Sequence, residues 1–163
     1  MEISKLDKKK HERKTFDCGV APLNAYLKQT ARQHDTVDYA HTYVLTSAEH
    51  AIIGYYTLST CTIRLTELPE PLNKRYPTNL QCVLIGRLAV DQKHQQRGHG
   101  STLLMNAIAR IVEADMPLPL LIVDAKDEQA KRFYEAFGFE LISPNSMRLY
   151  MPLSHARTMF EMA

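Results

Sequence analysis

The sequence has little cysteine, no tryptophan and no long apolar run. Its three cysteines, Cys18, Cys61 and Cys82, are odd in number and widely spaced, so we expect neither a disulfide framework nor a paired-cysteine metal site. The longest apolar stretch, residues 118–123, is interrupted by Pro119 and is far shorter than the ~20 residues of a membrane span. The N-terminus lacks the apolar segment of a signal peptide. We therefore expect a cytoplasmic protein with no metal ion and no membrane association.

A strong charge of one sign is also absent. The chain of 163 residues has 20 Lys and Arg against 18 Asp and Glu, so its formal net charge is only +2. This balance disfavours a protein that coats nucleic acid through a general positive charge. The charge is uneven, however, because residues 1–34 hold eight basic and four acidic side chains. A local basic face is therefore expected in the N-terminal part.

Apolar residues make up 45% of the chain, which is enough for a hydrophobic core. The length and the lack of repeats or a flexible linker predict a single domain over residues 1–163. Hydrophobic periodicity predicts strands at 3–6, 42–46, 52–63, 82–90, 118–124, 139–141 and 147–151, helices at 22–33, 98–114 and 127–137, and a proline-rich loop at 66–80. The strand, helix and strand over 82–124 form a parallel crossover. The predicted fold class is α/β or α+β with a mixed sheet.

The most informative segment joins the strand that ends at Val90 to the helix that begins near Gly98. Residues 88–101 read Leu-Ala-Val-Asp-Gln-Lys-His-Gln-Gln-Arg-Gly-His-Gly-Ser. Glycine lets the backbone approach a ligand closely, and the free amides of a helix N-terminus favour an anion. The segment predicts a pyrophosphate site in which Arg97 adds a charged donor. It lacks a Walker motif, and Leu103 replaces the third glycine of the dinucleotide fingerprint, so the glycines alone also fit a plain helix-start turn.

The whole pattern is more specific than the glycines. V-x-x-x-x-Q-x-x-G-x-G, an amphipathic helix, a parallel strand and a helix with Arg-Phe-Tyr-Glu-Ala-Phe-Gly-Phe at residues 132–139 follow one another. This order resembles the acetyl-CoA site of the GNAT superfamily of N-acetyltransferases, from Ile3 to Tyr150. The resemblance implies a GNAT fold with a mixed central sheet of about six to seven strands, splayed at strands 4 and 5, and about four flanking helices. It also implies acetyl-CoA as the cofactor and direct acetyl transfer.

The same resemblance implies the residues that bind acetyl-CoA. The fourth strand pairs its backbone with the pantetheine arm, and the following loop and helix start bind the pyrophosphate. The implied residues are Leu88, Ala89, Val90, Gln95, Gln96, Arg97, Gly98, His99, Gly100 and Ser101. Family members often place an asparagine before the fourth helix to contact pantetheine. Asp127 occupies the matching position here, and an aspartate can cap the helix instead.

Tyr134 is the candidate catalytic residue. Periodicity alone assigns it to a core stripe with Ala130, Phe133 and Phe137. The resemblance implies another role, because a tyrosine at this place in GNAT enzymes is positioned to protonate the departing CoA thiolate. A phenol is a suitable proton donor for that step. We therefore expect Tyr134 to act as the general acid.

A second, narrower resemblance begins at residues 16–27, Phe-Asp-Cys-Gly-Val-Ala-Pro-Leu-Asn-Ala-Tyr-Leu. They are similar to the signature F-D-C-G-x-x-x-L-N-x-[FY]-L of GNAT toxins from bacterial toxin–antitoxin modules, and segments 54–59, 86–90 and 149–153 match as well. The resemblance implies an enzyme that acetylates the α-amine of the amino acid on charged tRNA and so blocks translation. No His and Asp pair surrounds Cys18 in the sequence, so we expect Cys18 to pack structurally.

Acetylation of charged tRNA needs a neutral amine and contacts to phosphate. An α-amine titrates at about 8, so a dedicated general base is not required, although His34, His41, His94 and His99 are candidates. The acceptor stem needs cations to meet its phosphates. The candidate tRNA-binding residues are Lys28, Arg32, Arg87 and Lys93, with Arg97 in the cofactor loop. A solvated surface charge is the alternative for each of them.

The toxin resemblance also implies partners. Such toxins usually pair with a ribbon-helix-helix antitoxin, which inhibits them and binds operator DNA, and they tend to form homodimers. Two other functions stay open: a GNAT acetyltransferase of a small amine, a peptide or a protein amino group, and a non-catalytic acyl-CoA-binding co-repressor. The intact loop 95–100 and Tyr134 argue against the co-repressor, while the signature and the basic N-terminal half favour the toxin.

Overall fold

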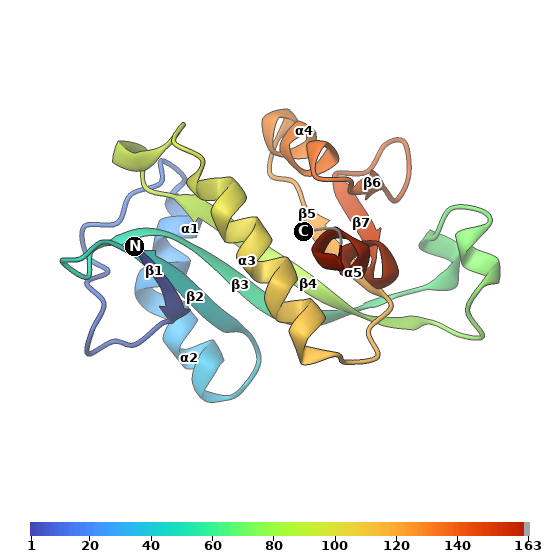
Figure 1. The fold of residues 1–163 in the computed structure, drawn as a ribbon, viewed down its shortest axis with the longest axis horizontal. Helices are drawn as coiled ribbons and strands as arrows, with labels where there is room; N and C mark the ends of the chain where they lie inside the picture. The colour runs from blue at the N-terminus through green and yellow to red at the C-terminus, as the bar shows by residue number, and fades with distance from the viewer. Residues whose placement is uncertain (162–163) are drawn as a thin grey trace. The chain divides into compact units, whose positions relative to one another are not determined.

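The computed structural model describes residues 1–161, which form two compact units. One unit contains Met1–Ser59 and Arg87–Ile108, and the other contains Thr60–Gly86 and residues 109–161. The strands follow the order β1-β2-β3-β4-β5-β7-β6 in a seven-stranded sheet (Figure 1). The predicted class and the mixed sheet are confirmed, whereas the single domain and the splay between the fourth and fifth strands stay predictions.

The first unit is built on an antiparallel meander. It consists of β1 (Glu2–Lys5), β2 (His41–Thr46) and β3 (Ile52–Ile63), of which β3 continues into the second unit. The end of β4 (Leu80–Val90) belongs to this unit as well. Each strand lies within two residues of its predicted position. The first six residues of β3 are buried in succession, so a dense apolar run rather than a strict alternation marks this strand.

Two adjacent tyrosines on β3 point to opposite faces of the meander. The Tyr55 hydroxyl donates to the carbonyl of Leu23 at 2.7 Å, and the Tyr56 hydroxyl donates to Oδ1 of Asn106 on α3 (His99–Ala114) at 2.6 Å. The N-terminal helical segment and the first turns of α3 therefore cover opposite faces of β3 (Figure 1). The N-terminal helical segment and α3, which both carry candidate site residues, are thus both anchored to β3.

The N-terminal helical segment is longer than predicted and is not uniform. It runs through α1 (Ala21–Ala25), a π-helical turn η1 (Tyr26–Thr30) and α2 (Ala31–Thr36). In the wide turn the Ala31 amide bonds to the Tyr26 carbonyl, five residues back. Tyr26 and Leu27 are consecutive and both lie in the core with Phe16, Cys18 and Val44. A wider turn accommodates two adjacent buried side chains that a regular α-helix would direct about 100° apart.

The second unit contains the parallel pairing. β4 pairs with β5 (Leu120–Asp124) from Val83–Leu121 to Ile85–Val123, and β5 pairs antiparallel with β7 (Arg148–Pro152). The short β6 (Glu140–Leu141) completes this end of the sheet. The four apolar residues of β5 are fully buried, as expected for a strand covered on both faces.

Helices α4 (Glu128–Ala136) and α5 (Leu153–Glu161) belong to the second unit. Asp127 caps α4, because its Oδ1 accepts from the Ala130 amide at 2.8 Å. The sequence prediction lacked α5 and left 66–80 as a loop, where the structure has short turns η2 (Leu65–Glu67) and η3 (Leu72–Lys74). Within residues 1–161 no helix is both long enough and apolar enough to span a bilayer.

Candidate active site

The loop between β4 and α3 has the backbone geometry of an anion site. Asp91 caps a short turn, η4 (Gln92–His94), by accepting the Lys93 amide at 2.9 Å. Gln96 and Gly98 both have left-handed φ angles, 63° and 83°, and α3 starts directly afterwards. Alternating backbone handedness before a helix turns successive amides toward one point, and the first amides of α3 have no partner within the helix. This exposed loop is therefore suited to hold a phosphate group.

Gln95, which the sequence placed among the cofactor residues, is engaged within the protein. Its Nε2 donates to the carbonyl of Val90 at 2.9 Å and to that of Cys18 at 3.2 Å. The side chain therefore ties the loop to the strand before it and to the N-terminal signature. With both Nε2 hydrogens engaged, Gln95 can donate to a cofactor phosphate only through its backbone amide.

The strand predicted to meet the pantetheine arm carries Leu88, Ala89 and Val90. Ala89 is buried, while Leu88 and Val90 are half-buried. The Ala89 carbonyl lies against Gly54 of β3, and a Cβ added to Gly54 would meet that oxygen at 2.8 Å. The position of this strand thus depends on a residue that has no side chain. The role of the three residues in cofactor binding stays a prediction.

Tyr134 lies on α4 and is 6% exposed. Its ring packs edge-on against Phe133 and Phe139, with centroids 5.3 and 5.8 Å away. Burial, and to a smaller extent the charge of Asp124, raises the pKa of Tyr134 to about 12. The phenol therefore keeps its proton throughout the physiological pH range and is available as a donor. Core packing and proton donation, the two roles that the sequence suggested, are compatible at this position.

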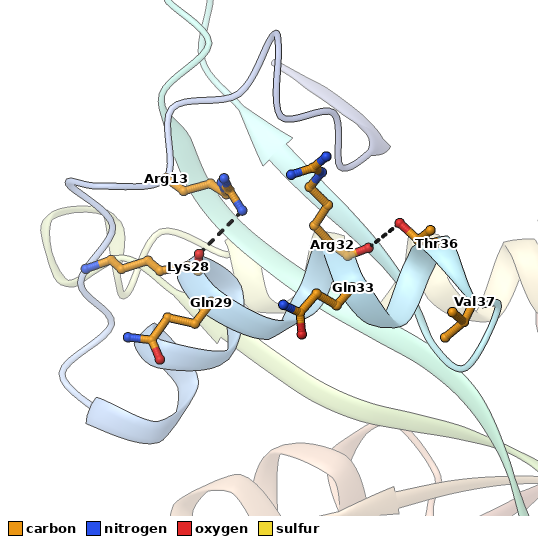
Figure 2. A pocket seen from close by; sticks show the side chains of 7 residues that line it. All are labelled: Arg13, Lys28, Gln29, Arg32, Gln33, Thr36 and Val37. Carbon is orange, nitrogen blue, oxygen red and sulfur yellow. Dashed lines mark hydrogen bonds between the residues drawn. The ribbon is translucent and has the colours of Figure 1, made fainter.

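Two of the candidate tRNA-binding residues line one groove. Lys28 and Arg32 share a groove of about 440 Å³ with Gln29 and Gln33, and Arg13 reaches it from the preceding loop (Figure 2). The Arg13 guanidinium donates to the Lys28 carbonyl at 3.5 Å, which fixes the loop beside the helical segment. Within the described chain the three cations form no ion pair with a carboxylate. The groove therefore presents unneutralised positive charge.

Arg13 was missed by the sequence analysis, although the basic excess of residues 1–34 pointed to it. The side chain lies outside the predicted helix, and helical position was what distinguished Lys28 and Arg32. A second basic surface, formed by residues 8–14, also includes Arg13. The signal was therefore the local charge count and not periodicity.

The other candidate cations have different surroundings. The Arg87 guanidinium carbon lies 3.5 Å from the centroid of the Tyr26 ring, a cation–π contact that holds this half-buried side chain in place. Lys93 and Arg97 are exposed on the cofactor loop. Arg87 is thus positioned by the N-terminal helical segment, whereas Lys93 and Arg97 are free to reach a ligand.

The candidate histidine bases are each near another group. The His34 Nδ1 lies 3.1 Å from the Tyr26 hydroxyl, and His41 Nε2 lies 2.9 Å from Asp38. The ring of His94, in the loop before α3, lies 6.2 Å from that of His99, the first residue of α3. Burial, with His94 and Arg97 nearby, lowers the pKa of His99 and favours its neutral form. None of these contacts selects one histidine as a base.

Comparison with known proteins identifies the family. The acetyltransferase (GNAT) domain family matches residues 38–141. The chain belongs to the GNAT acetyltransferases. This GNAT enzyme is 30% identical over 147 residues to a tRNA-acetylating toxin of Mycobacterium tuberculosis, a match that covers 89% of this chain and 88% of the relative. The predicted membership and the N-acetyltransferase class are confirmed.

Solved structures of GNAT toxins resemble this chain over nearly all its length. A tyrosine-to-phenylalanine mutant of KacT has a TM-score of 0.90 at 29% identity, and AtaT complexed with acetyl-methionyl-tRNAfMet has 0.87 at 29%; both matches cover 98% of each chain. AtaTR bound with AcCoA has a TM-score of 0.84 at 29% identity, over 98% of this chain and 97% of that one. The GNAT fold and acetyl-CoA as the acyl donor are thereby confirmed.

Proposed function

We propose that this GNAT enzyme is the toxin of a toxin–antitoxin module and acetylates the α-amino group of the amino acid on charged tRNA. The observation that carries the proposal is the 30% identity to a tRNA-acetylating toxin over 89% of this chain. The match includes the N-terminal half, where Lys28, Arg32 and Arg13 form an unneutralised basic groove. Cations of this kind neutralise the phosphates of a tRNA acceptor stem, whereas a small amine carries no phosphate to neutralise.

The proposed chemistry is direct transfer of the acetyl group. The loop 95–101 binds the pyrophosphate of acetyl-CoA, and the backbone of residues 88–90 holds its pantetheine arm. The neutral α-amine attacks the thioester carbonyl and the C–N bond forms, the nitrogen loses one proton to solvent, and the C–S bond then breaks. Tyr134 donates its phenolic proton to the departing thiolate. An α-amine has a pKa of about 8, so a useful fraction is neutral at pH 7 without a dedicated base.

The proposed partners follow from the relatives. AtaT has been solved bound to the C-terminus of the antitoxin AtaR, and KacTA has been solved as a complex with DNA. We infer that this chain pairs with a ribbon-helix-helix antitoxin, meets operator DNA only through that antitoxin, and forms a homodimer. Its substrate places the enzyme in the cytoplasm.

Expression without an antitoxin is expected to arrest growth. Purified protein with radiolabelled acetyl-CoA should label aminoacylated tRNA and leave uncharged tRNA unlabelled, because only the former carries a free α-amine. Growth curves and gel autoradiography measure the two effects. Normal growth together with unlabelled charged tRNA would exclude the toxin function and leave the acetyltransferase with another amine as its acceptor.

Removing charge from the groove is expected to weaken binding of tRNA. Each of the single substitutions Lys28→Gln and Arg32→Gln should raise KM for charged tRNA several-fold. Each should also lower the slope of log affinity against log salt by about 1, because one phosphate contact is lost. KM for acetyl-CoA should not change. Lys74→Gln, on an exposed turn of the other unit, makes the same change of charge and is the matched control. An unchanged salt dependence in both groove variants would remove the groove from the RNA site.

A further inference from the structure

The N-terminal signature and the cofactor loop, more than 70 residues apart in sequence, are joined by several hydrogen bonds. The Asp17 amide donates to Oδ2 of Asp91 at 3.0 Å, and the Asp17 carbonyl accepts from the Gln92 amide at 2.8 Å. The Cys18 carbonyl accepts from Nε2 of Gln95 at 3.2 Å. Two successive residues of the signature therefore hold both ends of the segment 91–95.

Asp91 lies at the centre of this connection. It is 8% exposed, and its two carboxylate oxygens have different partners. Oδ1 accepts from the Lys93 amide and shapes the loop's own turn, whereas Oδ2 accepts from the Asp17 amide. The Asp91 amide donates to the Ile53 carbonyl of β3 at 2.7 Å. The buried carboxylate of Asp91 thus links the turn of the loop to the signature. The backbone amide of Asp91 fixes both to β3.

Asn24 of α1 secures the other side of the signature. Its Oδ1 accepts from the Cys18 amide at 2.9 Å, and its Nδ2 donates to Oδ1 of Asp17 at 2.9 Å. The same Asp17 oxygen accepts the Gly19 amide at 2.9 Å. These bonds to the carboxylate lower the pKa of Asp17, so it stays ionised at neutral pH. Both polar atoms of the Asn24 side chain are therefore engaged by the signature.

Gly19 is favoured at this contact by its backbone conformation. Its φ is +87°, in the left-handed region that favours glycine, and an added Cβ would come within 2.5 Å of Nε2 of Gln92. The contact between the signature and the loop thus explains why Asp17, Gly19 and Asn24 are suited to their positions. Cys18 contributes its backbone, while its buried thiol packs in the core.

We propose that residues 17–19 and Asn24 form a support that positions the pyrophosphate-binding amides of the cofactor loop. The next three loop residues are Gln96, Arg97 and Gly98. They are exposed, so packing of their side chains does not define the conformation of the loop. Two of the three, Gln96 and Gly98, have left-handed φ angles. The side chain of Gln95 is what connects them to the support. Asn24, Asp91 and Gln95 are accordingly positioning residues. This inference rests on the proposed role of loop 95–101 in binding acetyl-CoA.

The test compares two ligands, of which only CoA carries the pyrophosphate and the 3′-phosphoadenosine group attached to it. Pantetheine lacks both groups, so loss of the support should weaken only CoA binding. Asn24→Ala removes both side-chain bonds to the signature, and Gln95→Met removes the tether without adding charge. For each we expect the Kd of CoA, measured by calorimetry, to rise about tenfold, while the Kd of pantetheine stays within about twofold. Asn145→Ala, at an exposed loop position of the other unit, is the matched control.

Thermal unfolding is measured alongside, and Gln95 is exposed, so its variant provides the result if Asn24→Ala does not fold. An unchanged Kd for CoA in folded variants would overturn the proposal, as would an equal loss for both ligands, since that would indicate a general structural role. Neither measurement involves tRNA, so failure of the toxin function leaves this test intact. If wild-type protein bound CoA no better than pantetheine, the loop would not be a pyrophosphate site and the support would have nothing to position.

Discussion

Replacing Tyr134 with phenylalanine is expected to lower kcat for acetyl transfer about a hundredfold, with little change in KM for acetyl-CoA or for charged tRNA. General acid catalysis contributes about 10² to 10⁴ in rate, and its efficiency falls as the pKa of the acid moves away from the working pH. Because burial raises the pKa of Tyr134 to about 12, we expect an effect at the lower end of that range. Single-turnover transfer to purified charged tRNA measures it.

The Tyr134→Phe protein should remain folded. The ring keeps its edge contacts with Phe133 and Phe139, and the hydroxyl makes no hydrogen bond to another residue of the described chain. No partner is therefore left unsatisfied, and the free energy of unfolding should change by less than about 1 kcal/mol. Tyr76→Phe, a partly buried tyrosine in the core of the same unit, is the matched control and should keep full activity.

The pH profile separates proton donation from packing. An acid must be protonated to act, and a pKa of about 12 keeps Tyr134 protonated well above neutrality. The wild-type kcat/KM should therefore rise with deprotonation of the α-amine, at about pH 8, and then stay level to about pH 10. A rate unaltered by Tyr134→Phe would assign the residue to the core stripe alone. A loss confined to KM would point to a binding role.

The parts of the fold that follow from local pattern could be predicted. β2, β3 and β4 carry dense runs of apolar residues and α3 carries a long apolar stripe, and these residues are largely buried in the structure. Asp127 was expected to be able to cap α4, and it does. α5 lacked such a signal, because only Leu153 and Ala156 are buried along its length. The π-helical turn at Tyr26–Thr30 depends on tertiary packing of two adjacent side chains and leaves no periodic trace.

The candidate site was predictable in its chemistry and less so in its contacts. The glycines and Arg97 predicted an anion site, since backbone freedom and charge are properties of single residues, and that site stays a prediction. The sequence could not show that the side-chain amide of Gln95 bonds to the carbonyls of Cys18 and Val90. The bond to Cys18 depends on the position of a segment 77 residues away in the chain. The signature at residues 16–19 was recognised as a pattern without a physical role. Its hydrogen bonds to residues 91–95 supply that role, and they exist only in the folded chain.

Gly54→Ala is expected to destabilise the protein by about 1 to 3 kcal/mol, because it overpacks a fully formed core. The new Cβ would lie 2.8 Å from the Ala89 carbonyl oxygen and 2.8 Å from a methyl carbon of Leu103. Leu103 can change rotamer only within a core where it is completely buried, and the carbonyl belongs to the backbone of β4. Moving either neighbour away from the new Cβ therefore costs free energy of folding.

The substitution should act on function through the same two neighbours. Ala89 is on the strand proposed to hold pantetheine, and Leu103 is on the first turns of α3, directly after the anion loop. Displacing both should raise KM for acetyl-CoA in the protein that remains folded, with a smaller change in KM for charged tRNA. Chemical denaturation and initial rates at low temperature measure the two effects, and Ser59→Ala, farther along β3, is the control. Wild-type stability in Gly54→Ala would mean that β3 and β4 are free to separate there, and that Gly54 does not set the position of the cofactor strand.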